Sequence, residues 1–411
     1  MAHPYRRLLQ DRDVSTLWAG VTISSIGSEL YAFGAIWLAV SIAGAEGSLL
    51  ATARFATILV MSVAAGAFVD LLPRRVLLIG ADLIRAAFSF LVVIVALADG
   101  LSLWLLIAVA MVLSACGTIY QPTLQSGIPQ IAPDQDRLRE TNGLIDATMR
   151  IAQAIGPFIA AAIVAVLPVI HLLTLNAASY LASAGAIFRM GHRLDGPMRE
   201  TRQTFRKRLL RGLDATKGCP GAWRILLTTC LRAAVAVLCL VVGIPLFFAQ
   251  SPAGSVSAAA FVIGAAAMWE VLANFVIVAR PVRSTWRSIF LGYASIGAGV
   301  ALIGVAELFL SGLMQVTTMA ASGLLIGFGN SMAGIQMLTW FGSRLDSGDF
   351  AAILRLRLMM VTAAATASTA LGAWIFEAAG IAATSIVGGT ILLGAAMIGV
   401  VSKEPPAGEP E

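Results

Sequence analysis

The chain has 411 residues, of which 58% are hydrophobic and only 12% are charged. An ordinary soluble domain carries about 25% charged residues, so this composition disfavours a large soluble protein. The net charge of +6 does not indicate nucleic-acid binding. The arginines and lysines lie in short clusters between apolar runs, where they fit anionic lipid headgroups and membrane topology.

An apolar run of about 20 residues is long enough to cross a bilayer as a helix, and the chain contains twelve such runs. We therefore predict an all-α membrane protein with twelve transmembrane helices. A cleavable signal peptide is not expected, because the first residues are polar and basic and the first apolar run is too long for one. The predicted spans are residues 14–41, 48–71, 76–98, 101–123, 142–166, 168–189, 223–249, 255–279, 287–310, 312–338, 352–377 and 380–401.

The basic residues fall on one side of these spans. With the N-terminus inside, the predicted cytoplasmic segments hold nearly all arginines and lysines, and the opposite loops hold Glu46, Asp99, Glu307 and Glu377. Only Arg54 falls near the outer face, where it could meet Glu46 or Glu307 or attract an anion. By the positive-inside rule, we expect a multi-pass membrane protein with both termini in the cytoplasm.

The longest polar segment, residues 190–222, divides the spans six and six. It predicts two pseudo-symmetric six-helix bundles, residues 1–189 and 223–401, joined by a cytoplasmic linker. Within the linker, a short amphipathic helix around residues 204–213 is expected on the membrane surface. The cytoplasmic tail comprises residues 402–411, and its segment KEPPAGEPE, residues 403–411, is expected to be disordered.

A charged turn, GAFVDLLPRR, joins the second and third spans. Gly66 and Asp70 are four residues apart, so they share one helix face. The two arginines that follow could pair with acids of the next cytoplasmic loop, or they could serve topology alone, although topology would not require Asp70. We expect this turn and the opening of span three to form a cytoplasmic gate made of Gly66, Asp70, Arg74, Arg75, Asp82 and Arg85.

Glu29 lies inside the first span, in the stretch GSELY. A carboxyl group inside the membrane is costly unless it is paired or functional, and burial would suit it to carry a proton; the alternative is a buried structural hydrogen bond. Arg232 lies well inside span seven. It could bind an anionic group and exchange it for Glu270, form a fixed pair with Glu270, or snorkel to the interface. The proton-coupling candidates are Glu29, Glu270 and Asp146, and the substrate-binding candidates are Arg232, Tyr31, Asn274 and Gln121.

Span five combines a charged pair with a Gly-Pro step. Asp146 and Arg150 are four residues apart, which favours an ion pair within the helix, although both could also face the other half of the chain. Gly156 and Pro157 permit a kink together with close helix packing, and we expect a hinge there.

The sequence lacks the patterns that mark common enzymes and metalloproteins. Its four cysteines show no CxxC spacing, so neither a disulfide framework nor a metal site is implied. It contains no GxxxxGK[ST] loop, which disfavours ATP-driven transport by this chain alone. We expect no catalytic residue, no cofactor and no bound metal.

The segment GAFVDLLPRRVLLIGADLIRA resembles the loop between the second and third helices of major facilitator superfamily transporters. The stretches ISSIGSELYAFGAIWL, YQPTLQSGIPQIAP and LNAASYLASA are similar to the subgroup of enterobactin-exporter-like and macrolide-efflux-like proteins. The detailed resemblance covers about residues 5–190. It implies two six-helix bundles that rock around a site near the membrane midplane, usually with proton exchange.

Two features depart from the pattern of that family. Gly156-Pro157 resembles its antiporter motif, but Phe158-Ile159 stands where the family has Gly-Gly. Proton-linked members often carry an intramembrane arginine in span four, and here Gln121 is the nearest polar substitute. If protons drive transport, the resemblance therefore implies that Glu29, or Glu270 in span eight, carries more of the proton coupling.

These observations and the resemblance together predict a secondary active transporter of the bacterial inner membrane that exports an amphipathic small molecule, such as a siderophore-like metabolite or a drug. The resemblance implies that it works by proton-coupled alternating access. Import of a siderophore or another metabolite is the alternative. A non-transporting membrane sensor or scaffold is disfavoured, since it has little need for buried charges. The expected partners are the small-molecule substrate, the proton and membrane lipid, without nucleic acid, and the expected state is a monomer.

Overall fold

The computed structural model describes residues 8–69, 72–132, 134–191, 193–194, 205–251, 254–278 and 284–406, with the backbone alone at 63–69, 205–209 and 278. Within these ranges every regular element is helical. The chain forms two compact units. Unit 1 comprises Met1–Ile42 and Ala53–Glu200, and unit 2 comprises Ala43–Thr52 and Thr201–Glu411.

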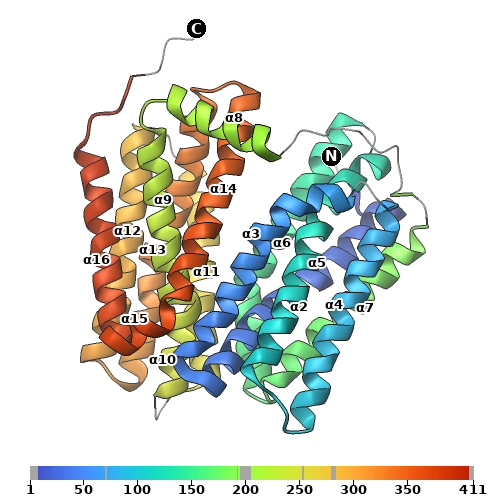
Figure 1. The fold of residues 1–411 in the computed structure, drawn as a ribbon, viewed down its shortest axis with the longest axis horizontal. Coiled ribbons are helices and arrows are strands. Elements are labelled where there is room, and N and C mark those ends of the chain that lie inside the picture. Colours follow the sequence, from blue (N-terminus) through green and yellow to red (C-terminus); the bar gives the residue numbers. More distant parts are fainter. Residues whose placement is uncertain are drawn as a thin grey trace. The chain divides into compact units, whose positions relative to one another are not determined.

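Unit 1 is built from long helices (Figure 1), and their buried side chains form an apolar core. Helix α4 packs against both α5 and α7. The core includes Val21, Leu78, Leu124, Ile145 and Ile187, one side chain from each of five helices. The helices are α2 (Arg12–Ala43), α3 (Ser48–Val69), α4 (Arg74–Leu97), α5 (Leu103–Ile131), α6 (Gln135–Val164) and α7 (Ile170–Arg189).

Unit 2 contains the remaining helices (Figure 1). Helix α12 packs against α13 and α16, and α11 packs against α13. One membrane-length segment, Ala222–Gln250, is made of α9, the π-helix η2 and α10. The elements are α8 (Phe205–Gly218), α9 (Ala222–Ala236), η2 (Val237–Gly243), α10 (Ile244–Gln250), α11 (Val256–Val278), α12 (Thr285–Phe309), α13 (Gly312–Gly342), α14 (Ser347–Ala370), α15 (Gly372–Ala379) and α16 (Ile381–Val401).

The helix lengths and their apolar character agree with the predicted membrane architecture. Eleven segments of the described chain are long and apolar enough to cross a membrane. The first of them, Arg12–Ser62, holds two helices, α2 and α3, which are joined by the 3-10 turn η1 (Gly44–Gly47). The segments therefore comprise twelve spanning helices, as the sequence predicted.

Polar side chains at several helix starts satisfy backbone N–H groups that have no partner within the helix. The Ser102 hydroxyl accepts from the N–H of Leu105 at the start of α5, at 3.3 Å. The Asp346 carboxylate accepts from the N–H of Asp349 at the start of α14, at 2.7 Å. Ser102 directly precedes an apolar run and Asp346 lies a few residues before one, so the local sequence accounts for where the two helices begin.

The predicted linker contains a helix, as expected, because α8 covers Phe205–Gly218. This helix packs against α14, and Arg211 donates to Asp349 at 3.0 Å. Its position on a membrane surface stays a prediction, as do the boundaries of the linker and of the two bundles.

The predicted disorder of the tail is wrong for residues 403–406. The Glu404 carboxylate accepts from the indole N–H of Trp340 at 3.1 Å and from the Arg344 guanidinium at 2.8 Å. Arg344 also donates to the carbonyl of Pro405 at 3.0 Å, and its guanidinium lies 4.4 Å from the Trp340 ring centre. The proline-rich composition predicts disorder because ordering such a segment costs conformational entropy. Three specific contacts offset that cost here, and composition does not reveal them. Residues 407–411 lie outside the described residues.

Asp11 caps α2 and ties it to α6. Its carboxylate accepts from the N–H groups of Asp13 and Val14 at 2.9 and 3.3 Å, and from Arg137 at 2.6 Å. Burial raises the pKa of Asp11, but the hydrogen bonds from Arg137 and the backbone outweigh burial and hold this pKa below its ordinary value. The ionised carboxylate therefore stabilises the folded unit.

We expect Asp11→Ala to lower the free energy of unfolding by about 1 kcal/mol at neutral pH, the usual cost of a lost cap. Because the folded pKa is lowered, this stabilisation is complete above the unfolded pKa of about 3.9 and is lost as the pH falls through the lower folded value. Thermal unfolding of the purified protein should show the difference shrinking below about pH 4. Asp11→Asn, which keeps an acceptor, should lose less; an equal difference at pH 7 and pH 3 would contradict this account.

Candidate functional site

A buried ion pair lies inside unit 1. Asp82 and Arg85, both on α4, are 0% and 6% exposed, and the Arg85 guanidinium donates to the Asp82 carboxylate. The rings of Tyr120 and Tyr180 lie over the guanidinium at 4.4 and 4.3 Å from its central carbon. A guanidinium is stabilised by a carboxylate and by aromatic faces, so this arrangement supplies what a charge needs in a membrane interior.

Hydroxyl groups extend this pair into a network between helices. The Tyr180 hydroxyl shares a hydrogen bond with Ser28 of α2, and the Tyr120 hydroxyl shares one with Ser183 of α7, each at 3.2 Å. The Arg85 side chain is thereby connected to groups from α2, α4, α5 and α7. We call Asp82, Arg85, Tyr120 and Tyr180 the arginine cage.

The cage borders a small polar cavity of about 90 Å³. Glu29, Arg85, Gln121 and Gln153 line it, so an acid and a base face one space inside the helices. The volume is sufficient for a few water molecules, and the polar walls would hydrogen-bond them. Three serines, Ser24, Ser25 and Ser28, complete the polar wall on α2.

Glu29 also contacts the predicted hinge. A Cβ atom placed on Gly156 would lie 2.5 Å from the Cβ of Glu29. Glycine at position 156 therefore lets α2 and α6 approach at the Gly156-Pro157 step, where a larger residue would collide. Arg54 of α3 lies within electrostatic range of Glu29, so a base of unit 1 acts on this carboxyl group.

The structure places the predicted gate residues in two different environments. Helix α4 begins at Arg74, so Arg85 lies about 16 Å along the helix at 1.5 Å per residue. Asp82 and Arg85 are thus interior residues rather than residues at the helix opening, and their mutual pairing makes this burial tolerable. Arg75 donates to the carbonyl of Phe188 at 3.0 Å and lies over its ring.

The remaining gate residues are described only in part. Asp70 lies outside the described residues, and Gly66 belongs to α3 with its backbone alone described. The gate itself therefore stays a prediction. On α6, Arg150 and Asp146 form the expected pair at 2.9 Å. Both of these side chains are exposed, 62% and 66% respectively, so the structure gives Asp146 no place in the Glu29 cavity.

In unit 2, the structure does not bring Arg232 and Glu270 together as an ion pair within the described ranges. Arg232 donates instead to the side-chain oxygen of Asn330 on α13, at 3.4 Å. The backbone carbonyl of Glu270 accepts from Ser331 at 2.8 Å, and Asn274 lies one helical turn further along α11. Tyr31 of unit 1 is buried at 5% exposure, and its hydroxyl has no hydrogen-bond partner among the residues the structure describes.

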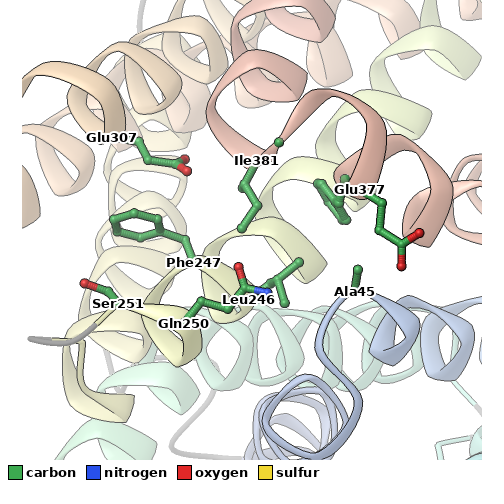
Figure 2. A pocket seen from close by; sticks show the side chains of 10 residues that line it. Ala45, Leu246, Phe247, Gln250, Ser251, Glu307, Glu377 and Ile381 are labelled. Atoms are coloured by element: carbon green, nitrogen blue, oxygen red, sulfur yellow. The ribbon is translucent and has the colours of Figure 1, made fainter.

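A larger cavity, about 480 Å³, lies in unit 2 and was not predicted (Figure 2). Glu307 and Glu377 both line it, and in Figure 2 they lie on opposite sides of Ile381. Phe247 and Gln250 of α10 form another part of the wall. From its sequence position, Glu307 is expected to be an acid of an outer loop and a possible partner of Arg54. The excess of acids on that side was the available signal, but it does not reveal which acid faces a cavity.

Comparison with known proteins identifies the family. Residues 17–353 match the family model of the Major Facilitator Superfamily. Macrolide efflux protein A of Streptococcus pyogenes is 28% identical over 148 residues, which is 36% of this chain and 36% of that protein. The chain thus aligns with only about a third of the length of this curated relative.

Solved transporter structures share the fold at low sequence identity. The nucleoside transporter NupG has a TM-score of 0.75 at 12% identity, covering 95% of this chain and 100% of that one. A bacterial homologue of the iron transporter ferroportin, in an inward-facing state, has a TM-score of 0.71 at 12% identity, covering 95% and 99%. With a family model that matches most of its length, the chain belongs to the Major Facilitator Superfamily and is a multi-pass membrane protein.

Proposed function

We propose that this protein is a proton-coupled secondary transporter that exports an amphipathic small molecule by alternating access. The observation that carries the proposal is the cavity in unit 1 that Glu29 and Arg85 line together. An ionisable acid beside a fixed positive charge, inside the membrane span, is the arrangement that a proton relay needs.

Glu29 is the residue that binds and releases the proton in this proposal. Arg85 already has Asp82 as its counter-ion, so it does not need Glu29 for neutrality, and Glu29 can change its charge without leaving Arg85 unpaired. Protonation removes the charge of Glu29 and changes how strongly the cavity holds water. Because Glu29 contacts Gly156, this change acts where α2 meets the Gly-Pro step of α6. The contact between α2 and α6 would then alternate between two packing arrangements that differ in their affinity for the proton, as coupling requires.

Export is favoured by the likeness to macrolide efflux protein A, and the proposed cargo is a drug or a siderophore-like metabolite. We also propose that the protein belongs to the enterobactin-exporter-like subgroup, lies in the bacterial inner membrane with both termini in the cytoplasm, and acts as a monomer. Import of such a molecule is the alternative direction. Arg232, Asn274, Gln121 and Tyr31 stay candidates for cargo contact, and Glu270 stays a second candidate for proton coupling.

Transport into inside-out vesicles tests the function and its direction. We expect a labelled macrolide to accumulate in vesicles that contain the protein when the vesicle interior is acidified, because protons leaving the vesicle drive cargo inward. An uncoupler should abolish this accumulation, and vesicles without the protein should show none. Accumulation that ignores the pH gradient would refute proton coupling, and gradient-driven loss of cargo from preloaded vesicles would reverse the direction.

A further inference from the structure

We propose that Arg232 and Arg357 together form an anion-binding site inside unit 2, which takes the carboxylate, phosphate or sulfonate group of an amphipathic ligand. This inference rests on the proposed transport function only in identifying the ligand as the cargo. The binding site itself is a separate claim about two side chains.

The two arginines come from helices that pack against each other, α9 and α14. Arg357 lies within electrostatic range of Arg232, and Cys230 lies within range of both guanidinium groups. Two like charges at this separation repel, and the repulsion is weakly screened away from water. An arginine side chain cannot lose its proton in a protein, so an anion bound between the two guanidinium groups would relieve the repulsion.

Neither arginine has an acidic partner among the residues the structure describes. Arg232 has a neutral partner, Asn330, at the long distance of 3.4 Å. The Nε atom of Arg357 is buried and has no hydrogen-bond partner in the described part of the chain. A buried donor without a partner costs about 1–3 kcal/mol, which an incoming acceptor would recover.

The comparison with Arg85 shows how this protein neutralises an arginine that serves structure. Arg85 has a carboxylate and two aromatic faces, whereas Arg232 and Arg357 have no carboxylate in the described ranges of unit 2. Two planar guanidinium groups match the oxygens of a carboxylate or phosphate, which accept paired hydrogen bonds. Both arginines lie on membrane-spanning helices, so the ligand that reaches them carries an apolar body behind its anionic group.

Tyr293 adds a hydroxyl group beside the same site. It is 2% exposed, it shares a hydrogen bond with Thr229 at 2.7 Å, and it lies within electrostatic range of Arg357. The hydroxyl is thus held in place by α9 and can position the guanidinium of Arg357. Side chains from α9, α12, α13 and α14 therefore converge on one positive site.

Binding of two matched probes to the purified protein tests the site. We use 2-naphthoate as the anionic probe and 2-naphthylmethylammonium as its cationic counterpart, since they share a ring system and differ in charge. Dissociation constants come from the rise in thermal unfolding temperature with probe concentration. We expect naphthoate to stabilise the wild type, and we expect Arg357→Gln and Arg232→Gln each to weaken it about tenfold, which is about 1.4 kcal/mol.

Arg355→Gln is the matched control. Arg355 is exposed and lies two positions before Arg357 on α14, so its replacement should leave naphthoate binding unchanged. Arg357→Lys keeps the positive charge but removes the planar, forked set of N–H donors, so this variant should bind naphthoate with intermediate affinity. It also provides a measurement if Arg357→Gln does not fold. Equal stabilisation by the cationic probe, or unchanged naphthoate affinity in both Arg232→Gln and Arg357→Lys, would overturn the proposal.

The outcome separates this inference from the proposed transport function. If the arginine variants bind naphthoate like the wild type while vesicles still show gradient-driven flux, the anion site is wrong and the transporter stands. If naphthoate binding depends on both arginines but no flux is seen, the site stands and its identification with a cargo site is wrong.

Discussion

Replacing Glu29 by glutamine is expected to abolish transport driven by a pH gradient while leaving the protein folded. Glutamine has nearly the same shape and still hydrogen-bonds in the polar cavity, but it cannot exchange a proton. We expect gradient-driven flux in vesicles to fall at least about tenfold. This decrease corresponds to a rise of about 1.4 kcal/mol in the activation free energy of transport. Exchange of labelled for unlabelled cargo without a gradient should persist, because that process needs binding and helix movement but no net proton transfer.

Glu46→Gln is the control for the Glu29 variant. Glu46 is exposed, in the turn between α2 and α3, so its neutralisation should leave flux unchanged. Full gradient-driven flux in Glu29→Gln would remove Glu29 from proton coupling and direct attention to Glu270. Loss of exchange together with gradient-driven flux would instead indicate a structural role, which was the alternative interpretation of this buried acid.

The second large effect concerns the glycine contacts of α12. We expect Gly297→Ala to lower the unfolding temperature strongly, because an added Cβ would lie 2.6 Å from the carbonyl oxygen of Gly389 and 2.7 Å from the amide nitrogen of Leu393. Both neighbouring atoms are backbone, so α12 and α16 must separate. Overpacking of this kind costs about 1–3 kcal/mol, and inside a membrane it also removes the close approach on which helix association depends.

Gly394→Ala is the matched control on α16. Nothing lies within 4 Å of a Cβ added there, and alanine favours a helix over glycine by about 1 kcal/mol. Thermal unfolding of the purified variants should therefore show a large decrease for Gly297→Ala and no decrease for Gly394→Ala. Equal unfolding temperatures for the two variants would show that the close contact between α12 and α16 contributes little to stability.

The membrane architecture could be predicted because a lipid environment leaves the backbone few options. Each spanning segment must satisfy its own N–H and C=O groups, so an apolar run of sufficient length becomes a helix. Breaks within helices could not be found in this way. The π-helix at Val237–Gly243 lies within one uninterrupted apolar run. The step between α14 and α15 depends on packing, since a Cβ on Gly372 would lie 2.9 Å from the Cβ of Ser48.

The candidate site was predictable in its residues but not in its partners. Glu29 was identified because an acid inside an apolar run is rare, yet its contact with Gly156 joins positions far apart in the chain. Asp82 and Arg85 were assigned to the helix opening, since hydropathy does not state how deep a paired charge lies. Arg357 could have been found by the rule that identified Arg232, because it lies inside the predicted span 352–377.

The arginine cage has a mechanical consequence for unit 1. Because it links groups on α2, α4, α5 and α7 around one guanidinium, we expect those four helices to resist displacement relative to one another and to move together. We then expect movement to be easier for α3 and α6, which contribute no group to the cage among the side chains that the structure describes. Of these two, α6 carries Pro157, which removes a backbone hydrogen bond and softens the helix beside Glu29. A rigid group of four helices and one flexible helix within the same unit allow a small change beside Glu29 to be converted into a displacement of the whole group.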